Sequence, residues 1–243
     1  MSQLLKLSLV TLVGKLLCTT IALAGPLTPE ESIRTFQFES PDLHVSLVAA
    51  EPQVIDSVAI CFDPAGDIYV VESRGYPHSS KGLPDKKEGI IARLRDLDGD
   101  GRYETRNVFA RDFAFPNGIL PWRGGFFVTA APNVIYLKDT DNNGVADHRK
   151  TVLTGFQTDS SSEQLRVACP TLGPDGWVYV TSGLTGAKIT SPIHPDRLPV
   201  EVRRNDGRFH PETFEYQPLQ SYGQFGLTFD QHGRRFINSN RNP

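Results

Sequence analysis

The stretch FDPAGDIYV (residues 62–70) closes an apolar run, makes a tight Asp-Pro-Ala-Gly-Asp turn and at once begins a β-branched and aromatic run. This order of residues predicts a β-hairpin. Related segments recur as GGFFV (124–128), LGPDGWVYV (172–180) and FDQHGRRFI (229–237). Their turn glycines, placed at 66, 125, 176 and 233, are 59, 51 and 57 residues apart. A repeat of this length made of short strands is typical of four-stranded β-propeller blades.

The rest of each period supplies two further strands. We expect third strands at residues 90–95, 134–138 and 207–210, and fourth strands at 105–110, 148–154 and 213–217. Beyond a short stretch at 29–31, the sequence after residue 24 has no helical period. We therefore predict an all-β fold with three complete blades and the first hairpin of a fourth. Because an open ring exposes strand edges, we interpret this as the N-terminal part of a six- or seven-bladed propeller.

The first 24 residues have the composition of a secretory signal peptide. Lys6 precedes a mostly apolar run that ends in Ala22-Leu23-Ala24, which predicts cleavage before Gly25. Residues 25–243 then form the propeller domain, and no later segment is apolar enough to span a membrane. We expect a periplasmic or extracellular protein.

Charge and cysteine content exclude other classes. Twenty-five Lys and Arg residues against 28 Asp and Glu give a net charge of −3, which argues against a nucleic-acid binder that uses a basic surface. Two cysteines remain after the signal peptide, Cys61 and Cys169, and both lie in strand-like runs. They form either a disulfide or, the alternative we favour, two thiols that pack as small apolar side chains.

Two acidic loops join the expected third and fourth strands. Both follow the pattern D-x-D-x-[DN]-G-x-x-[DE], in which alternate oxygen ligands converge on one hard cation and the glycine permits a sharp turn. The predicted calcium ligands, including two backbone carbonyls, are Asp96, Asp98, Asp100, Arg102 and Glu104, and then Asp139, Asp141, Asn143, Val145 and Asp147. The alternative is an Asx-rich turn without metal. We expect these sites to stabilise the fold and to take no part in catalysis.

A second set of polar residues falls at the opposite ends of the strands, where propellers commonly bind ligands. The candidate ligand contacts there are Arg74, Tyr76, Asn117, Gln164, Arg166, Asn240 and Arg241. Arginine in this place suits an anionic or oxygen-rich ligand, because its guanidinium group makes paired charge-assisted hydrogen bonds. The alternative is that each side chain is solvated or caps a turn. No catalytic residue can be assigned from the sequence.

Several motifs in this order resemble the PVC-type membrane-bound dehydrogenase domain of planctomycetes and verrucomicrobia, a family similar to glucose/sorbosone dehydrogenase propellers. They include EPQVIDSVAICFDPAGDIYVVESRGYP, DLDGDGRYETRNVFA, QLRVACPTLGPDGWVYVTSGLTG and FGLTFDQHGRRFINSNRNP. The resemblance implies an exported propeller joined to a cytochrome c or haem module, and relatives that oxidise sugars with pyrroloquinoline quinone. In this chain Cys169-Pro170 stands where the resemblance implies His-Pro.

We therefore expect an exported, calcium-stabilised propeller that acts on a sugar or polyol as an oxidoreductase, with pyrroloquinoline quinone as the cofactor implied by the resemblance. Electrons would pass to a separate haem module, since this sequence holds no C-x-x-C-H motif. The alternative is a propeller without catalysis that binds a glycan or a protein partner on the same face.

Overall fold

The computed structural model describes residues 25–76, 86–157 and 164–240, so the predicted signal peptide lies outside the described residues. The chain divides into two units, Met1–Val45 and Ser46–Pro243. The smaller unit contains α1 (Pro29–Ile33), as the sequence predicted. Thr28 caps this helix: its hydroxyl accepts the Glu31 N–H at 3.2 Å, and the Glu31 carboxylate accepts the Thr28 N–H at 2.8 Å. No helix in the described ranges has the length and apolar character needed to cross a bilayer.

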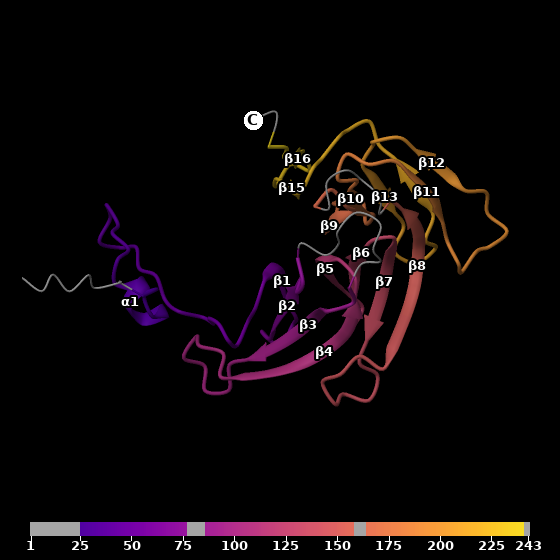
Figure 1. Ribbon diagram of the computed structural model, residues 1–243. Helices are drawn as coiled ribbons and strands as arrows, with labels where there is room; N and C mark the ends of the chain where they lie inside the picture. Colours follow the sequence, from indigo (N-terminus) through magenta and orange to yellow (C-terminus); the bar gives the residue numbers. More distant parts are fainter. Residues whose placement is uncertain (1–24, 77–85, 158–163, 241–243) are drawn as a thin grey trace, which may run out of the picture. The chain divides into compact units, whose positions relative to one another are not determined.

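The first sheet of the larger unit is a four-stranded antiparallel meander. Its strands, which lie in chain order, are β1 (Ser57–Phe62), β2 (Ile68–Glu72), β3 (Gly89–Arg95) and β4 (Thr105–Phe113) (Figure 1). All three expected segments of this repeat form strands, and β3 and β4 extend slightly beyond the predicted bounds.

The second sheet begins as the same meander and is then enlarged. Its first four strands are β5 (Pro116–Trp122), β6 (Gly125–Ala130), β7 (Asn133–Lys138) and β8 (His148–Phe156). The sequence did not predict the hairpin of β11 (Ala187–Thr190) and β12 (Val200–Val202), which pairs with the outer edge of β8. This hairpin covers an otherwise open edge and brings Ile189 and Val202 into the core.

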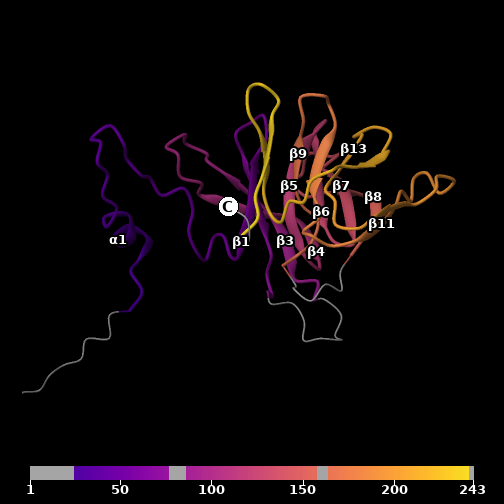
Figure 2. The same cartoon turned by 90° about the horizontal axis from the view of Figure 1, so that it is seen from above.

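The strands of the third sheet come before and after that hairpin in the sequence. Its strands are β9 (Ala168–Leu172), β10 (Val178–Thr181), β13 (Gly207–Phe209) and β14 (Tyr216–Pro218), and they pair in this order. A two-stranded sheet of β15 (Leu227–Phe229) and β16 (Arg235–Ile237) follows. The first strands of successive sheets contact one another, β1 with β5, β5 with β9 and β9 with β15, and both views place β5 between β1 and β9 (Figures 1 and 2).

The repeated hairpin turns have a common hydrogen-bond pattern. In the first, the Asp63 carboxylate accepts the N–H groups of Ala65 and Asp67 at 2.9 and 3.0 Å, and Gly66 has φ 90°. Asp230 and Gly233 repeat this arrangement between β15 and β16. In the second repeat the sequence predicted Gly125 as the turn glycine, and this prediction is wrong by one residue. Gly124 takes the positive φ of 75°, whereas Gly125 already belongs to β6.

The core lies between consecutive sheets. One cluster joins the first and second sheets and contains Val71, Phe109, Val128 and Leu137. A second cluster joins the second and third sheets through Phe127, Leu153 and Phe209. Each fully buried aromatic or aliphatic side chain contributes roughly 1.5–3 kcal/mol, so these interfaces hold the successive sheets together.

The all-β fold with antiparallel sheets is confirmed. The number of blades and their closure into a ring remain predictions.

Both cysteines are free thiols. Cys61 packs against the first cluster, and burial raises its pKa to about 12, with the Asp63 carboxylate adding to the shift. The packing interpretation is therefore the one that holds for Cys61.

Candidate functional site

A pocket of about 420 Å³ lies where several strands of the larger unit begin or end. Asp56 and Ser57 stand at the start of β1, Ser73 follows β2, and Asn117 lies at the start of β5. The remaining lining residues are Val58, Tyr76, Phe115, Gln164, Ala168 and Phe225. The predicted meander explains this gathering, because β2–β3 connections and connections between sheets lie at the same ends of the strands.

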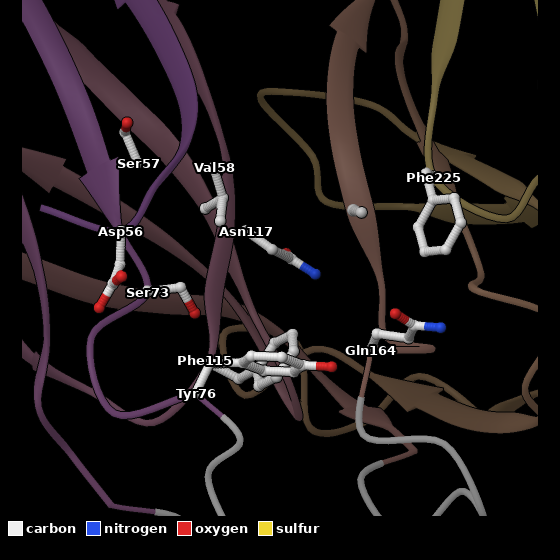
Figure 3. Close-up of a pocket in the computed structure, with 10 residues that line it drawn as sticks. Asp56, Ser57, Val58, Ser73, Tyr76, Phe115, Asn117, Gln164 and Phe225 are labelled. Atoms are coloured by element: carbon white, nitrogen blue, oxygen red, sulfur yellow. The ribbon is translucent and has the colours of Figure 1, made fainter. Parts of the chain in front are cut away.

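Aromatic rings and side-chain amides dominate the pocket. Tyr76 and Phe115 meet edge to face with their centroids 6.4 Å apart. Figure 3 shows Asn117, Gln164 and Phe225 around the same space, with the Asn117 amide nitrogen directed into it (Figure 3). The Asn117 amide oxygen accepts the Thr129 hydroxyl at 2.9 Å. This bond orients the amide so that its NH₂ group is directed into the pocket.

One wall of the pocket has an irregular backbone. Asp56 adopts φ 50°, and the β1–β2 pairing shifts register between Ser57 and Ala59. The Ser73 N–H donates to the Asp56 carbonyl at 3.0 Å, which ties the two strand ends together. Bulges of this kind redirect side chains and are frequent beside binding sites. The sequence pattern did not single out Asp56, Ser57 or Phe225, and only their places next to predicted strand ends point to them.

Tyr76, Asn117 and Gln164 are the predicted ligand contacts that line this pocket. Arg74 is directed elsewhere: its Nε and Nη2 lie 2.7 and 2.6 Å from a carboxylate oxygen of Glu72, which is fully buried. Arg106 on β4 approaches the same carboxylate at 3.3 Å. The buried Glu72 charge is thus compensated by two guanidinium groups, as a buried carboxylate requires.

The other predicted contacts lie around the pocket. Arg166 is 2% exposed, and its guanidinium carbon lies 5.6 Å from the centroid of the Phe115 ring. Asn240 donates its backbone N–H to the buried Gln224 side chain at 3.1 Å. Arg241 lies outside the described residues. Of these residues, Arg166 is the one that supports a pocket wall, through a cation–π contact.

Cys169, which stands where the resemblance implies histidine, has a structural role here. Its Sγ accepts the Leu227 N–H at 3.3 Å and lies 3.4 Å from the Leu227 carbonyl, so it connects β9 to β15. Gly118 of β5 packs closely on the same segment, because a Cβ there would lie 2.4 Å from Pro170 Cδ. The thiol therefore helps to align β9 with β15, and Pro170 packs against β5.

The first acidic loop has the geometry of a candidate metal site. One carboxylate oxygen from each of Asp96, Asp98, Asp100 and Glu104 lies within 4.8 Å of the others. Calcium–oxygen bonds of about 2.4 Å place opposite ligands about 4.8 Å apart, so a single ion fits this spacing. Backbone hydrogen bonds, that from Gly101 first, hold the pKa of the Asp96 carboxyl below its ordinary value.

The second acidic loop repeats the backbone hydrogen bonds but differs in its carboxylates. Asp139 accepts the Gly144 N–H at 2.7 Å, and Asp147 accepts the Thr140 N–H at 2.8 Å. The Thr140 hydroxyl also donates to Asp147 and is the main cause of the lowered pKa of that carboxyl. Within the described ranges, the first loop alone brings at least three carboxylates to within 4.8 Å of one another.

A family model matches residues 28–243 of this sequence. The chain belongs to the DUF7133 family, a domain of unknown function. This match does not test the resemblance to a PVC-type dehydrogenase domain, which stays a prediction. No relative was found among curated proteins.

Two solved structures from Trichoderma reesei are similar to this DUF7133 chain, an iodide structure and a calcium structure of Carbohydrate-Active Enzymes Family AA12. Both are 15% identical in sequence. The first covers 69% of this chain and 38% of its own length with a TM-score of 0.46. The second covers 60% and 37% with a TM-score of 0.42. The chain thus spans less than two fifths of either structure.

Proposed function

We propose that the larger unit is part of a β-propeller and that the pocket at Tyr76, Asn117 and Gln164 binds a sugar or polyol. The observation that carries this proposal is the lining itself, in which aromatic rings stand beside amides and hydroxyls. Aromatic rings pack against the C–H faces of a sugar, and amides both donate to and accept from its hydroxyl groups. A volume of about 420 Å³ suits a small ligand of this class.

The repeated connectivity supports the propeller. Successive four-stranded meanders place their first strands against one another, from β1 to β5 to β9. Strands that line a central channel have this relation in a propeller. An exported location and a haem-carrying electron acceptor are further proposals, which rest on the N-terminal sequence and on the resemblance alone.

Pyrroloquinoline quinone does not fit the described lining of this pocket. The cofactor carries three carboxylates and calls for cationic partners, yet the described residues that line the pocket include no lysine or arginine. Of the predicted cations, Arg74 is paired with the buried Glu72, and Arg166 contacts the Phe115 ring without being a lining residue. We therefore propose binding of a neutral hydroxylated ligand and derive no redox step.

We further propose that the acidic loops bind calcium. The four gathered carboxylates of the first loop support this most directly, because hard cations prefer oxygen ligands at this spacing. The backbone carbonyls of Arg102 and Val145 complete the predicted ligand sets. Both loops lie in connections between third and fourth strands, at the strand ends opposite the pocket, so the proposed ions stabilise the fold and leave the ligand untouched.

Isothermal titration calorimetry of the full chain with D-glucose, xylitol and glycerol tests the ligand proposal. Asn117→Ala should weaken binding about threefold to tenfold, the effect of losing one neutral hydrogen bond. Lys188→Ala, at a side chain that is 65% exposed on β11, is the matched control and should bind as the unchanged protein does. Equal affinity of the Asn117 variant would refute the site.

A dye-reduction assay with added calcium and pyrroloquinoline quinone tests the oxidoreductase alternative, and turnover there would replace the binding proposal.

A further inference from the structure

Two adjoining cavities lie at the other ends of the strands that frame the pocket. They measure about 510 and 180 Å³ and share Asp63, Tyr69, Gly124 and Phe126 as lining residues. Asp63 belongs to the β1–β2 turn and Gly124 to the β5–β6 turn. The cavities therefore form one wedge between the hairpin turns of the first two sheets, and we call it the turn-end wedge.

Tyr69 forms the floor of the turn-end wedge. Its side chain is 5% exposed and packs on Phe126 and Phe109, with centroid distances of 4.2 and 5.0 Å. Within the described residues its hydroxyl makes no hydrogen bond, although the residue lines both cavities. Burial raises the pKa of Tyr69 to about 12, so the hydroxyl stays a neutral donor at ordinary pH. Because Tyr69 lines both cavities, its hydroxyl can donate a hydrogen bond to a ligand bound there.

Further polar groups, both hydrogen-bond acceptors and hydrogen-bond donors, line the smaller cavity. Asp63 uses one carboxylate oxygen for two backbone N–H groups, and its second oxygen has no partner among the described residues. Asn142 stands at φ 60° in the second acidic loop, and its side-chain amide likewise has no partner there. Arg93 also lines this cavity and donates to Asp67 at 2.7 Å, so its charge is compensated.

The mixture of these groups selects the chemical class of ligand. The carboxylates of Asp63 and Asp139 disfavour an anion in the smaller cavity. Hydroxyl, amide and carboxylate groups together match a ligand that both donates and accepts hydrogen bonds. Pro64, Pro121 and Phe126 line the larger cavity and provide apolar contact beside the polar end.

We propose that the turn-end wedge is a second saccharide-binding site, in which the Tyr69 hydroxyl and the Asp63 carboxylate hold a sugar hydroxyl while Pro64 and Pro121 contact the sugar ring. This site is separate from the pocket at Asn117 and shares no lining residue with it. An oligosaccharide would thus have two places of attachment on one chain.

The test uses the full chain carrying Asn117→Ala, which weakens the first pocket, and titrates it with maltotriose by calorimetry. Adding Tyr69→Phe should lower the affinity about threefold to tenfold, because it removes one hydrogen bond and keeps the packed ring. Asn142→Gly should lower it by a similar factor, and this variant retains the fold because glycine accepts a positive φ. The melting temperature of each variant verifies folding.

Choline and inorganic phosphate serve as probes for the other ligand classes and should not bind. The proposal is overturned if maltotriose does not bind, if it binds equally well with Tyr69→Phe and Asn142→Gly, or if choline or phosphate binds in its place. Failure of the proposal for the first pocket does not affect this test, because every variant in it already carries Asn117→Ala. The first pocket is tested separately, by comparing Asn117→Ala with Lys188→Ala.

Discussion

The two ends of β1 and β2 are built in different ways. At the turn end, Asp63 holds the hairpin through backbone groups two and four residues away. At the pocket end, Glu72 is bound by Arg74 and by Arg106, which is 34 residues distant. The turn end therefore depends on local hydrogen bonds that a short motif can encode. The pocket end depends on a buried charge whose partners meet only when the sheet has formed.

The largest expected effect comes from removing the charge at the pocket end. Glu72→Ala leaves two guanidinium groups without their buried carboxylate and should cost about 3–5 kcal/mol of unfolding free energy. Urea denaturation measures this loss. Glu201→Gln removes a carboxylate that is 73% exposed and paired with Lys188, and it should cost less than about 1 kcal/mol. Similar losses for both variants would contradict the contrast between the two ends.

Calcium should stabilise the side of the larger unit that bears the acidic loops. At a concentration a hundredfold above its dissociation constant, a ligand of the native state adds about 2.7 kcal/mol of stability. Asp98→Ala should remove more of the calcium-induced rise in melting temperature than Asp141→Ala, because the first loop gathers its carboxylates more closely. The double variant should show no rise. A rise that persists in the double variant would show that calcium binds elsewhere.

A local substitution at the turn end should have a smaller effect. Gly66 has φ 90° and no atom within 4 Å of an added Cβ, so Gly66→Ala introduces backbone strain without a clash. The expected cost is roughly 1–2 kcal/mol in thermal or urea unfolding. Gly25→Ala, at an open position without a positive φ, should be close to neutral. A neutral Gly66 variant would mean that the turn is less tightly specified than its repeated motif indicates.

Tyr69 predicts a small pH dependence at the same end. The ordinary pKa of 10 applies in the unfolded chain, and burial raises it to about 12 in the folded chain. The contribution of Tyr69 is therefore complete below pH 10 and declines as the pH rises towards 12, because the unfolded state loses its proton first. Ultraviolet titration of tyrosinate should show one fewer late-titrating group in Tyr69→Phe. If the number of tyrosines that ionise at high pH is the same in Tyr69→Phe, the raised pKa belongs to another tyrosine.

The elements that the sequence predicted well are those with local causes. The Asp-x-x-Gly turns and the two acidic loops each form their hydrogen bonds between residues of one short motif. The six-stranded second sheet was not predicted, since β11 joins β8 from a segment that lies inside the next repeat. Short strands such as β12 have too few residues for an apolar alternation to be recognised.

In the candidate site, too, the features with local causes were predicted and those that depend on distant contacts were not. Topology alone brought Tyr76, Asn117 and Gln164 to one end of the strands, and they line one pocket. The sequence could not separate them from Arg74, since nothing local shows that Glu72 is fully buried and takes that guanidinium group. Likewise, the free hydroxyl of Tyr69 follows from where two hairpin turns leave space.

The sequence by itself determined the all-β class, the hairpin repeat and the acidic loops, because hydrogen bonds between near neighbours encode them. The tertiary structure decided which polar groups are buried, which are paired and which face a cavity. Those properties depend on contacts between residues far apart in the chain, and the free energy of a buried charge or an unpaired donor arises only when packing excludes water.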